Sequence, residues 1–198
     1  RDIDEARRAA IAATHDRLAA HGQRLLGVAW RDRPLDCTTC AVADEEKLIF
    51  AGYAVFIDPP KASAAATIEN LARAGVEIKI VSGDNELVVG HVARELGIRG
   101  ASVLIGREVD RLDDEALAVR ADATTLFCRV DPAQKNRILR ALQSRGHVVG
   151  YLGDGVYDAP SLKAADIGIS VEGATDVARQ AADIIMTKPD LEIGRAHV

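Results

Sequence analysis

The sequence predicts an α/β protein built on a doubly wound parallel sheet, and three observations support this prediction. Short apolar runs alternate with helical patterns from residue 58 onward, which is the rhythm of β–α–β units. Aromatic residues make up only 4% of the chain, and the apolar content of 48% is rich in Ala, Val, Ile and Leu, which suits strands buried between helices. Polar motifs follow several predicted strands, at the edge of a parallel sheet where active sites lie.

The first 57 residues predict a different, α+β arrangement, which ends at an Asp-Pro-Pro-Lys run. Apolar residues at helical spacing predict an amphipathic helix over 2–20, and a His-Gly pair ends it. Strands are predicted over 24–30 and 47–57, with a polar, proline-containing loop over 31–44 between them. We therefore expect this part of the chain to be separate from the parallel sheet that follows.

From residue 61 onward the predicted elements alternate between helices and strands. Helices are assigned from a period of about 3.6 residues in the apolar positions, and strands from short apolar runs between turn residues. The predicted helices cover 61–74, 86–96, 108–120, 132–145, 159–164 and 175–181. The predicted strands cover 76–81, 103–105, 124–127, 147–152, 167–171 and 184–186. Because such crossovers are right-handed, this alternation predicts a doubly wound parallel sheet.

The most informative motif is Gly-Asp-Gly-Val-Tyr-Asp at residues 153–158. Asp154 and Asp158 stand on a glycine-bracketed turn after an apolar strand. Two carboxylates so close together suit a hard cation, usually Mg²⁺, beside a phosphate. An ordinary Asp-Gly turn between a strand and a helix explains the same residues. The motif alone leaves both interpretations open.

Two further motifs favour the interpretation as a phosphate and metal site. The Ser-Gly-Asp run at 82–84 closes an apolar strand and precedes a helix that begins near Asn85. Its hydroxyl and N–H groups, together with the helix dipole, can bind an oxyanion, although a simple helix N-cap is the alternative. Lys135 lies one turn into a helix opened by Pro132, at a position where a lysine is usually a solvated surface charge.

In the order Ser-Gly-Asp, Pro-x-x-Lys and Gly-Asp-Gly-x-x-Asp, these motifs resemble the haloacid-dehalogenase-like (HAD-like, Rossmannoid) phosphoryl-transfer fold. In P-type cation-transporting ATPases the same motifs form the phosphorylation domain. The resemblance runs from about Arg17 to Leu191, which is nearly the whole chain. Each motif is weak alone, but the set is specific.

Other stretches are similar to the pumps and not to soluble phosphatases of this fold. The Asp-Pro-Pro-Lys run at 58–61 resembles the hinge by which the nucleotide-binding domain of a pump returns to the phosphorylation domain. The resemblance thus divides the chain into the end of a nucleotide-binding domain, 1–57, and a phosphorylation domain, 58–191. Further stretches similar to the pumps lie at 164–171 and 181–185. Those most similar to the magnesium-transporting branch, ahead of calcium or proton pumps, lie at 127–129 and 171–174.

The resemblance also implies a reaction, in which an aspartate attacks the γ-phosphate of ATP and forms an aspartyl-phosphate with Mg²⁺ as cofactor. Asp154 would hold Mg²⁺ jointly with that aspartate, and Asp158 would support the metal site. Arg24 would reach the ATP phosphates, although a strand-edge arginine is an equally good interpretation. The implied catalytic residues are Ser82, Lys135, Asp154 and Asp158. The implied nucleotide and phosphate contacts are Arg24, Ser82, Gly83, Asp84 and Lys135.

The chain departs from the family pattern at both ends. The Asp-Lys-Thr-Gly-Thr run that carries the nucleophile is absent. We therefore expect an internal fragment, inactive by itself, whose nucleophile and central strand lie upstream of Arg1. Residues 192–198 match what a common sequencing adapter would encode, so we interpret them as a scar outside the fold.

Two substitutions fall inside the motifs. Ser82 stands where the family usually has threonine, and it keeps the hydroxyl. Tyr157 stands where the family has asparagine, so a bulky phenol replaces a compact amide close to the phosphate. If Tyr157 is genuine, it predicts sharply reduced phosphoenzyme formation even in a complete protein.

Composition narrows the classes of function. A net charge of -5 with no basic stripe argues against a nucleic-acid partner. The Cys37–Cys40 pair lacks a second cysteine pair or a histidine partner, so a zinc or redox site is not expected there. No apolar run reaches the roughly 20 residues that span a bilayer.

Three hypotheses follow. The first is the catalytic portion of an ATP-driven cation pump, most similar to magnesium transporters, at the cytoplasmic face of the inner membrane. Its partners would be ATP and a cation that crosses through membrane helices of the parent protein. The second is a soluble phosphatase of the same fold. The third is a degenerate nucleotide-binding module, which a genuine Tyr157 would favour.

Overall fold

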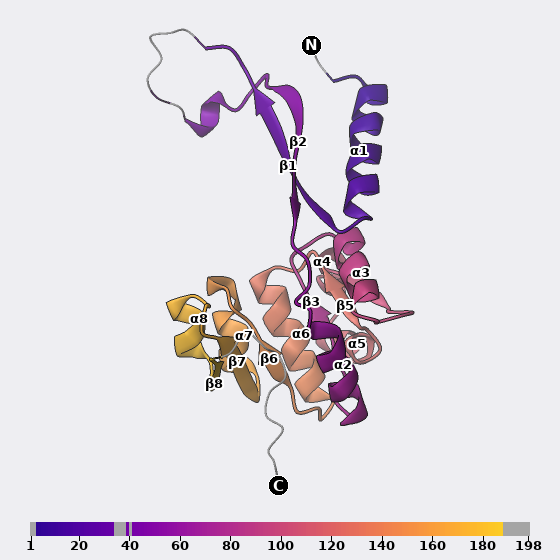
Figure 1. The fold of residues 1–198 in the computed structure, drawn as a ribbon, viewed down its shortest axis with the longest axis vertical. Helices are drawn as coiled ribbons and strands as arrows, with labels where there is room; N and C mark the ends of the chain where they lie inside the picture. Colours follow the sequence, from indigo (N-terminus) through magenta and orange to yellow (C-terminus); the bar gives the residue numbers. More distant parts are fainter. Residues whose placement is uncertain (1–2, 34–38, 40, 188–198) are drawn as a thin grey trace. The chain divides into compact units, whose positions relative to one another are not determined.

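The structure is a computed structural model that describes residues 3–33, 39 and 41–187 (Figure 1). The cysteine pair at 37 and 40 and the expected scar at 192–198 lie outside the described residues. The chain divides into two compact units, Arg1–Pro59 and Pro60–Val198. The division falls inside the Asp-Pro-Pro-Lys run.

The first unit consists of a helix and a β-hairpin. Helix α1 covers Glu5–Ala19, and the antiparallel strands β1 and β2 cover Gln23–Trp30 and Ile49–Ile57. A short 3₁₀ helix, η1, covers Val42–Asp44. The predicted helix and both predicted strands are therefore confirmed, with their ends shifted by a few residues. The helix starts at Glu5 because the Asp4 side chain caps it and accepts a hydrogen bond from the N–H of Arg7 at 2.7 Å.

The apolar face of α1 is narrower than predicted. Ile3, Ala6 and Ala10 are exposed, and Ala19 is the buried residue of this helix. The half-buried residues of the predicted apolar face are Ile11, Thr14 and Leu18. The helix contacts the hairpin there, because the Tyr53 hydroxyl on β2 donates a hydrogen bond to the carbonyl of Ile11 at 3.2 Å. The spacing of the apolar residues therefore predicted a wider buried face on this helix than the structure has.

The second unit contains the alternating elements. Its α-helices are α2 (Ala64–Arg73), α3 (Glu86–Glu95), α4 (Gly106–Val109), α5 (Asp114–Asp122), α6 (Pro132–Ser144), α7 (Ala159–Ala164) and α8 (Asp176–Ala181). Its strands are β3 (Ile80–Val81), β4 (Val103–Ile105), β5 (Leu126–Cys128), β6 (Gly150–Leu152), β7 (Ile167–Val171) and β8 (Ile184–Met186). A 3₁₀ turn, η2, covers Val156–Asp158. The alternating order of strands and helices agrees with the prediction.

The strands of this unit pair in parallel, as predicted, and they form two sheets; the doubly wound sheet was expected to lack its central strand. One has the order β3-β5-β4 and the other β6-β7-β8. Within the described residues, β3 and β6 each have a neighbour on one side only. Both are also shorter than the apolar runs over 76–81 and 147–152 that predicted them. Backbone that lacks a ladder partner is not fixed as a strand, which explains the shortening.

The predicted helix over 108–120 is wrong in detail, because two helices occupy this stretch. Helix α4 ends at Val109, and α5 begins at Asp114. The Asp113 side chain starts the second helix by accepting a hydrogen bond from the N–H of Ala116 at 2.8 Å. An aspartate that caps a helix prevents the preceding helix from continuing through it.

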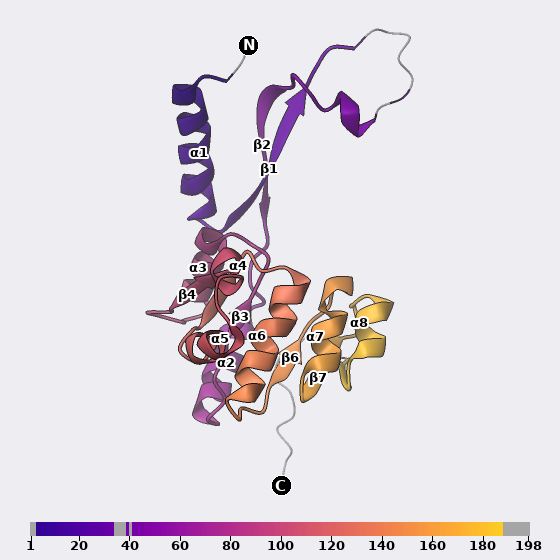
Figure 2. The same cartoon turned by 180° about the vertical axis from the view of Figure 1, so that it is seen from behind.

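The core of the second unit forms around β5 and the helices α5 and α6. Phe127 on β5 is fully buried, and burial of such a side chain contributes about 1.5–3 kcal/mol. Val81 on β3 and Val149 just before β6 pack against the same buried cluster, so the two sheets share one core. Helices α7 and α8 contact each other beside β7, as both views show (Figures 1 and 2).

Candidate functional site

The turn at residues 82–84 lies at the carboxyl end of β3 and is held by β5 and by the loop that follows it. The N–H of Ser82 donates to the carbonyl of Phe127 at 2.9 Å, and the N–H of Val130 donates to the carbonyl of Ser82 at 3.2 Å. Within the turn, the Ser82 hydroxyl accepts from the N–H of Asp84 at 3.1 Å and lies 3.2 Å from its carboxylate. The turn is thus fixed mainly through its backbone.

Helix α3 is capped by the residue that follows this turn. The Asn85 side chain accepts a hydrogen bond from the N–H of Leu87 at 2.7 Å, and the helix begins at Glu86. The alternative that Ser82 or Asp84 serves as the N-cap is therefore wrong. The turn precedes a helix that already has its cap.

Arg129 completes the support of this turn, and sequence reasoning assigned it no role. Its N–H donates to the carbonyl of Asp84 at 2.8 Å, and its backbone has a φ of 52°, in the left-handed region that non-glycine residues seldom adopt. Its guanidinium donates to the Glu86 carboxylate at 2.6 Å and holds the pKa of that carboxyl below its ordinary value. The sequence marked this position only through the Phe-Cys-Arg run at 127–129, and the residue types in that run do not reveal the left-handed backbone angle of Arg129.

The loop after β5 also passes close to a glycine at the start of α4. A Cβ atom on Gly106 would collide with the carbonyl oxygen of Arg129 and would lie 2.5 Å from the side-chain oxygen of Gln134. Gln134 is itself engaged, because its side-chain oxygen accepts from the N–H of Asp131 at 2.9 Å. Three chain segments thus meet where only glycine fits.

Lys135 is positioned by a well-defined start to helix α6. Asp131 accepts from the N–H of Gln134 at 2.8 Å, the reciprocal bond completes a capping box, and Pro132 takes the first helical position. One turn in, the Lys135 ammonium lies 2.8 Å from Oδ1 of Asp158, and the two side chains are 15% and 14% exposed. The alternative that Lys135 is a solvated surface charge is therefore wrong.

Asp158 is held by more than its lysine. Its Oδ1 also accepts a hydrogen bond from the Tyr151 hydroxyl at 2.9 Å, and its Oδ2 accepts from the N–H of Gly155 at 3.1 Å. Burial raises the pKa of this carboxyl, but the hydrogen bonds from Lys135, Tyr151 and Gly155 outweigh it and hold the pKa below the ordinary value. Asp158 is thus an ionised, well-anchored carboxylate.

Gly153 makes this close arrangement sterically feasible. A Cβ atom at this position would lie 2.6 Å from Cβ of Asp158 and 3.0 Å from the ring of Tyr151. The corresponding atom on Gly83, in the other turn, would meet only the carbonyl oxygen of Val130 at 3.5 Å, an ordinary contact. The glycine before Asp154 is therefore a packing requirement, and the glycine after Ser82 is not.

Asp154 is exposed at the end of β6, on the same turn. Its carbonyl accepts from the N–H of Thr175 at 3.0 Å and lies 3.3 Å from the Thr175 hydroxyl, which ties the turn to the start of α8. Asp154 borders a cavity of about 300 Å³, which is also lined by Lys61, Leu152, Gly153 and Val171. Thr175 and Lys61 were not predicted as site residues.

The donor set fits a divalent cation only in part. Asp154 offers an exposed carboxylate next to a cavity, the type of oxygen ligand that Mg²⁺ accepts together with several waters. Both oxygens of Asp158 are already engaged by Lys135, Tyr151 and Gly155. In the part of the chain that the structure describes, no group of three or more His, Cys, Asp or Glu is arranged to hold a metal. Asp154 is therefore better placed than Asp158 to contact a cation, and Asp158 contacts Lys135 instead.

The structure thus connects the three predicted motifs of the second unit. Val130 joins the turn at 82–84 to the loop that leads into α6, and Lys135 joins α6 to Asp158. All three motifs follow the carboxyl ends of β3, β5 and β6. Arg24 belongs to the first unit, where its guanidinium lies 4.0 Å from the Asp58 carboxylate.

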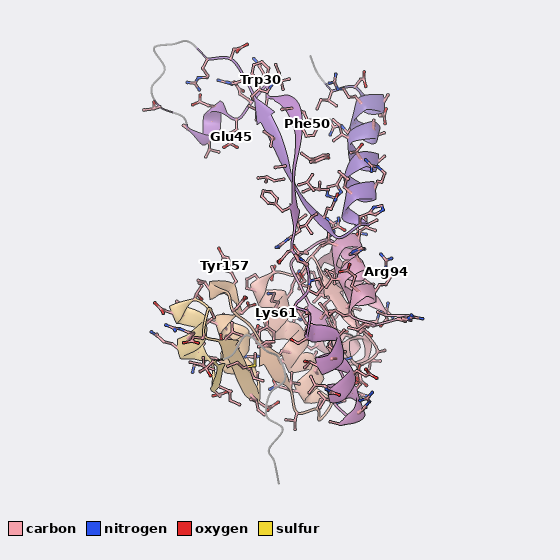
Figure 3. All side chains as sticks on the ribbon, viewed as in Figure 1. Trp30, Glu45, Phe50, Lys61, Arg94 and Tyr157 are labelled. Atoms are coloured by element: carbon pink, nitrogen blue, oxygen red, sulfur yellow. The ribbon has the colours of Figure 1, made fainter. Side chains whose placement is uncertain are left out.

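Tyr157 is also in the second unit, but it takes no part in these connections. Its side chain is 75% exposed and projects from the surface at η2 (Figure 3). The phenol therefore does not displace Lys135 or Asp158, and the turn accommodates it without losing their ion pair.

A haloacid-dehalogenase-like α/β fold is the class with which this architecture agrees, and sequence comparison identifies it. The family model of haloacid dehalogenase-like hydrolases matches residues 3–166, and the chain belongs to that family. The matched range includes the Ser-Gly-Asp, Pro-x-x-Lys and Gly-Asp-Gly-x-x-Asp motifs.

Comparison with individual proteins points to cation pumps. The chain is 46% identical over 178 residues to the magnesium-transporting ATPase, P-type 1, of Salmonella typhimurium and equally to that of Escherichia coli K12. It is 33% identical over 181 residues to a calcium-transporting ATPase of Listeria monocytogenes. Each match covers 90% of this chain but only 20% or 21% of the relative. The chain spans about a fifth of the length of these relatives.

Proposed function

We propose that this chain is catalytic machinery of an ATP-driven, Mg²⁺-dependent P-type cation pump that works through an aspartyl-phosphate. The observation that carries this proposal is the largely buried Lys135–Asp158 ion pair on the same turn as the exposed Asp154, at the same ends of parallel strands as the Ser82 turn. Phosphoryl transfer depends mostly on positioning and charge neutralisation, which this arrangement can supply.

Each residue has a distinct part in the proposed reaction. The Ser82 hydroxyl and the N–H of Gly83 bind phosphoryl oxygens, and Lys135 neutralises charge on the nucleophile and the phosphoryl group. Asp84 contacts the nucleotide. Asp154 holds Mg²⁺, which when bound neutralises charge on the phosphates. Asp158 holds the Lys135 ammonium in place until the phosphoryl group binds.

The two units are assigned to two domains of the proposed pump. Residues 1–57 are the end of a nucleotide-binding domain, in which Arg24 reaches the ATP phosphates. Residues 58–191 belong to the phosphorylation domain, and residues 192–198 lie outside it. The catalytic part faces the cytoplasm, and the transported cation crosses through membrane helices of the parent. Among the described residues, none of the helices combines the length and apolarity that crossing a bilayer requires.

The interrupted sheet supports the proposed origin of the nucleophile. Within the described residues, β3 and β6 are edge strands, and they differ from the other edges, β4 and β8, in that Val81 on β3 and Val149 just before β6 pack against one shared core. A parallel strand between them would join the sheets in the order β4-β5-β3, new strand, β6-β7-β8. A nucleophile at the carboxyl end of that strand would lie next to the Ser82 and Asp154 turns. We assign this strand to the parent protein, and the chain alone is therefore inactive.

Magnesium is the proposed cargo, because the relatives at 46% identity are magnesium transporters and the calcium transporter is less similar. The soluble phosphatase is not favoured, since the relatives are pumps. The degenerate module loses part of its support, because the exposed Tyr157 leaves the ion pair at Lys135 intact.

The test is phosphoenzyme formation by the complete parent protein in membranes, with ATP labelled at the γ-phosphate. We expect Mg²⁺-dependent labelling that hydroxylamine removes, since hydroxylamine cleaves acyl-phosphates. Asp154→Asn should reduce the labelling at least about a hundredfold. Labelling that resists hydroxylamine, or ATP hydrolysis with no labelled protein under rapid quenching, would exclude an aspartyl-phosphate.

A further inference from the structure

The Tyr151 hydroxyl shares one carboxylate oxygen with the proposed catalytic lysine. Tyr151 lies on β6, and its ring packs against the buried cluster of Leu162, Ala178 and Ala181. Its hydroxyl donates to Oδ1 of Asp158 at 2.9 Å, and the Lys135 ammonium reaches the same atom at 2.8 Å. An apolar ring would satisfy the packing, so the hydroxyl serves another purpose.

The purpose follows from what Lys135 must do. To neutralise a phosphoryl group, its ammonium has to turn away from Asp158, and that carboxylate is only 14% exposed. A largely buried carboxylate that loses its counter-charge is costly unless hydrogen bonds remain. That cost would keep the Lys135 ammonium at Asp158 and away from the phosphoryl group.

Two donors stay in place when Lys135 moves. The N–H of Gly155 keeps Oδ2 at 3.1 Å, and the Tyr151 hydroxyl keeps Oδ1. Burial and the neighbouring Asp158 charge both raise the pKa of Tyr151, so the phenol stays protonated and remains a donor. Asp158 therefore stays satisfied in both positions of the lysine.

We propose that Tyr151 is a positioning residue that holds Asp158 in place when Lys135 leaves it for the phosphoryl group. This inference rests on the proposed function. It adds that the hydroxyl lowers the barrier to phosphoryl transfer without touching nucleotide or phosphate. Sequence reasoning missed Tyr151 because a tyrosine in an apolar strand looks like a core residue.

The kinetic test compares Tyr151→Phe with the wild type in the complete parent pump. We expect the rate of phosphoenzyme formation at saturating ATP to fall about tenfold, the effect of one hydrogen bond to a charged group, with the KM for ATP within twofold. The matched control is Tyr53→Phe, which removes a hydroxyl that donates to the carbonyl of Ile11 in the first unit. The control should keep the wild-type rate.

A second measurement on the 198-residue chain asks whether the hydroxyl acts through Asp158. Urea unfolding is compared for Tyr151→Phe in the wild-type and in the Asp158→Ala background. We expect the folding equilibrium constant to fall about tenfold in the first and less than about threefold in the second. An equal loss in both backgrounds would assign the hydroxyl to ring packing and overturn the inference.

The outcomes separate the inference from the function on which it rests. A wild-type pump that forms no acyl-phosphate overturns both. A wild-type pump that does form one, with Tyr151→Phe at the same rate, overturns only the inference. A loss that appears in KM, or equally in Tyr53→Phe, also overturns it, because a positioning role acts on the chemical step alone.

Discussion

The turn at 82–84 and the turn at 153–158 both follow a parallel strand, but they are held in different ways. Backbone hydrogen bonds to β5 and to the loop after it fix the first turn. The second turn also has backbone hydrogen bonds, to Ile169 and Thr175, but in addition it is fixed by a carboxylate that accepts from a lysine, a tyrosine and a backbone N–H. A turn held by its backbone tolerates many side chains, whereas a turn held through one carboxylate depends on each partner of that group.

The largest effect should come from removing the lysine of the second turn. Lys135→Met leaves Asp158 largely buried without its counter-charge and removes the cation from the phosphoryl site. We expect phosphoenzyme formation by the complete pump to fall about a thousandfold, measured by rapid-quench labelling. Lys163→Met, an exposed lysine on α7, is the matched control and should keep its activity. Comparable losses in both variants would show that the effect is not specific to the ion pair.

A pair of glycine substitutions tests the comparison of the two turns directly. Gly153→Ala places a Cβ atom 2.6 Å from Asp158, and Gly83→Ala places one 3.5 Å from a carbonyl oxygen. We expect the first to lower the free energy of unfolding by about 1–3 kcal/mol and the second to change it by less than about 0.5 kcal/mol. Urea denaturation of the two variants measures this. Equal losses would mean that the turns are equally constrained.

A substitution at Tyr157 tests whether the phenol at this position of the second turn limits phosphoryl transfer. We expect Tyr157→Asn to raise phosphoenzyme formation by the complete pump about tenfold, because a compact amide can donate where the phenol cannot. Since the phenol is 75% exposed, the free energy of unfolding should change by less than about 0.5 kcal/mol. Tyr157→Phe serves as the control and should bring no gain. A Tyr157→Asn variant with unchanged labelling would show that the position is not limiting.

The smallest effect is a pH dependence of stability. Burial raises the pKa of Asp158, but its hydrogen bonds lower the pKa by more than burial raises it. The folded-state pKa therefore lies below the ordinary 3.8. The folded state then binds the proton less readily than the unfolded state. The stabilisation is fully present above about pH 5 and is lost as the pH falls through the lower folded-state pKa.

Urea denaturation of the wild type and Asp158→Asn between about pH 3 and 7 measures this dependence. The difference between the two should stay constant above about pH 5 and shrink at the acid end. A difference that grows as the pH falls would mean that the pKa is raised in the folded state.

Sequence patterns predicted the elements well where local signals decide them. Pro132 and Asp131 mark the start of α6, and the apolar run at 167–171 becomes β7 unchanged, with neighbours on both sides. The strands at 76–81 and 147–152 were overestimated, because the length of a strand depends on a partner that no local pattern reveals.

The site was predicted in its chemistry but not in its contacts. The motifs identified Lys135 and Asp158, yet the choice between a surface charge and a buried partner required the fold. Tyr151 and Arg129 could not be found from the sequence, since one resembles a core residue and the other acts through an unusual backbone angle. Residues that hold a site in place carry weaker signals than residues that act in it.

Gly106 has a consequence for the tolerance of this region to mutation. No side chain fits there, because the carbonyl of Arg129 and the side chain of Gln134 occupy the space that a Cβ atom would need. Every amino acid that a change in a glycine codon can introduce carries that atom. Position 106 should therefore tolerate no substitution in a library of random variants, although it lies outside the three motifs of the site.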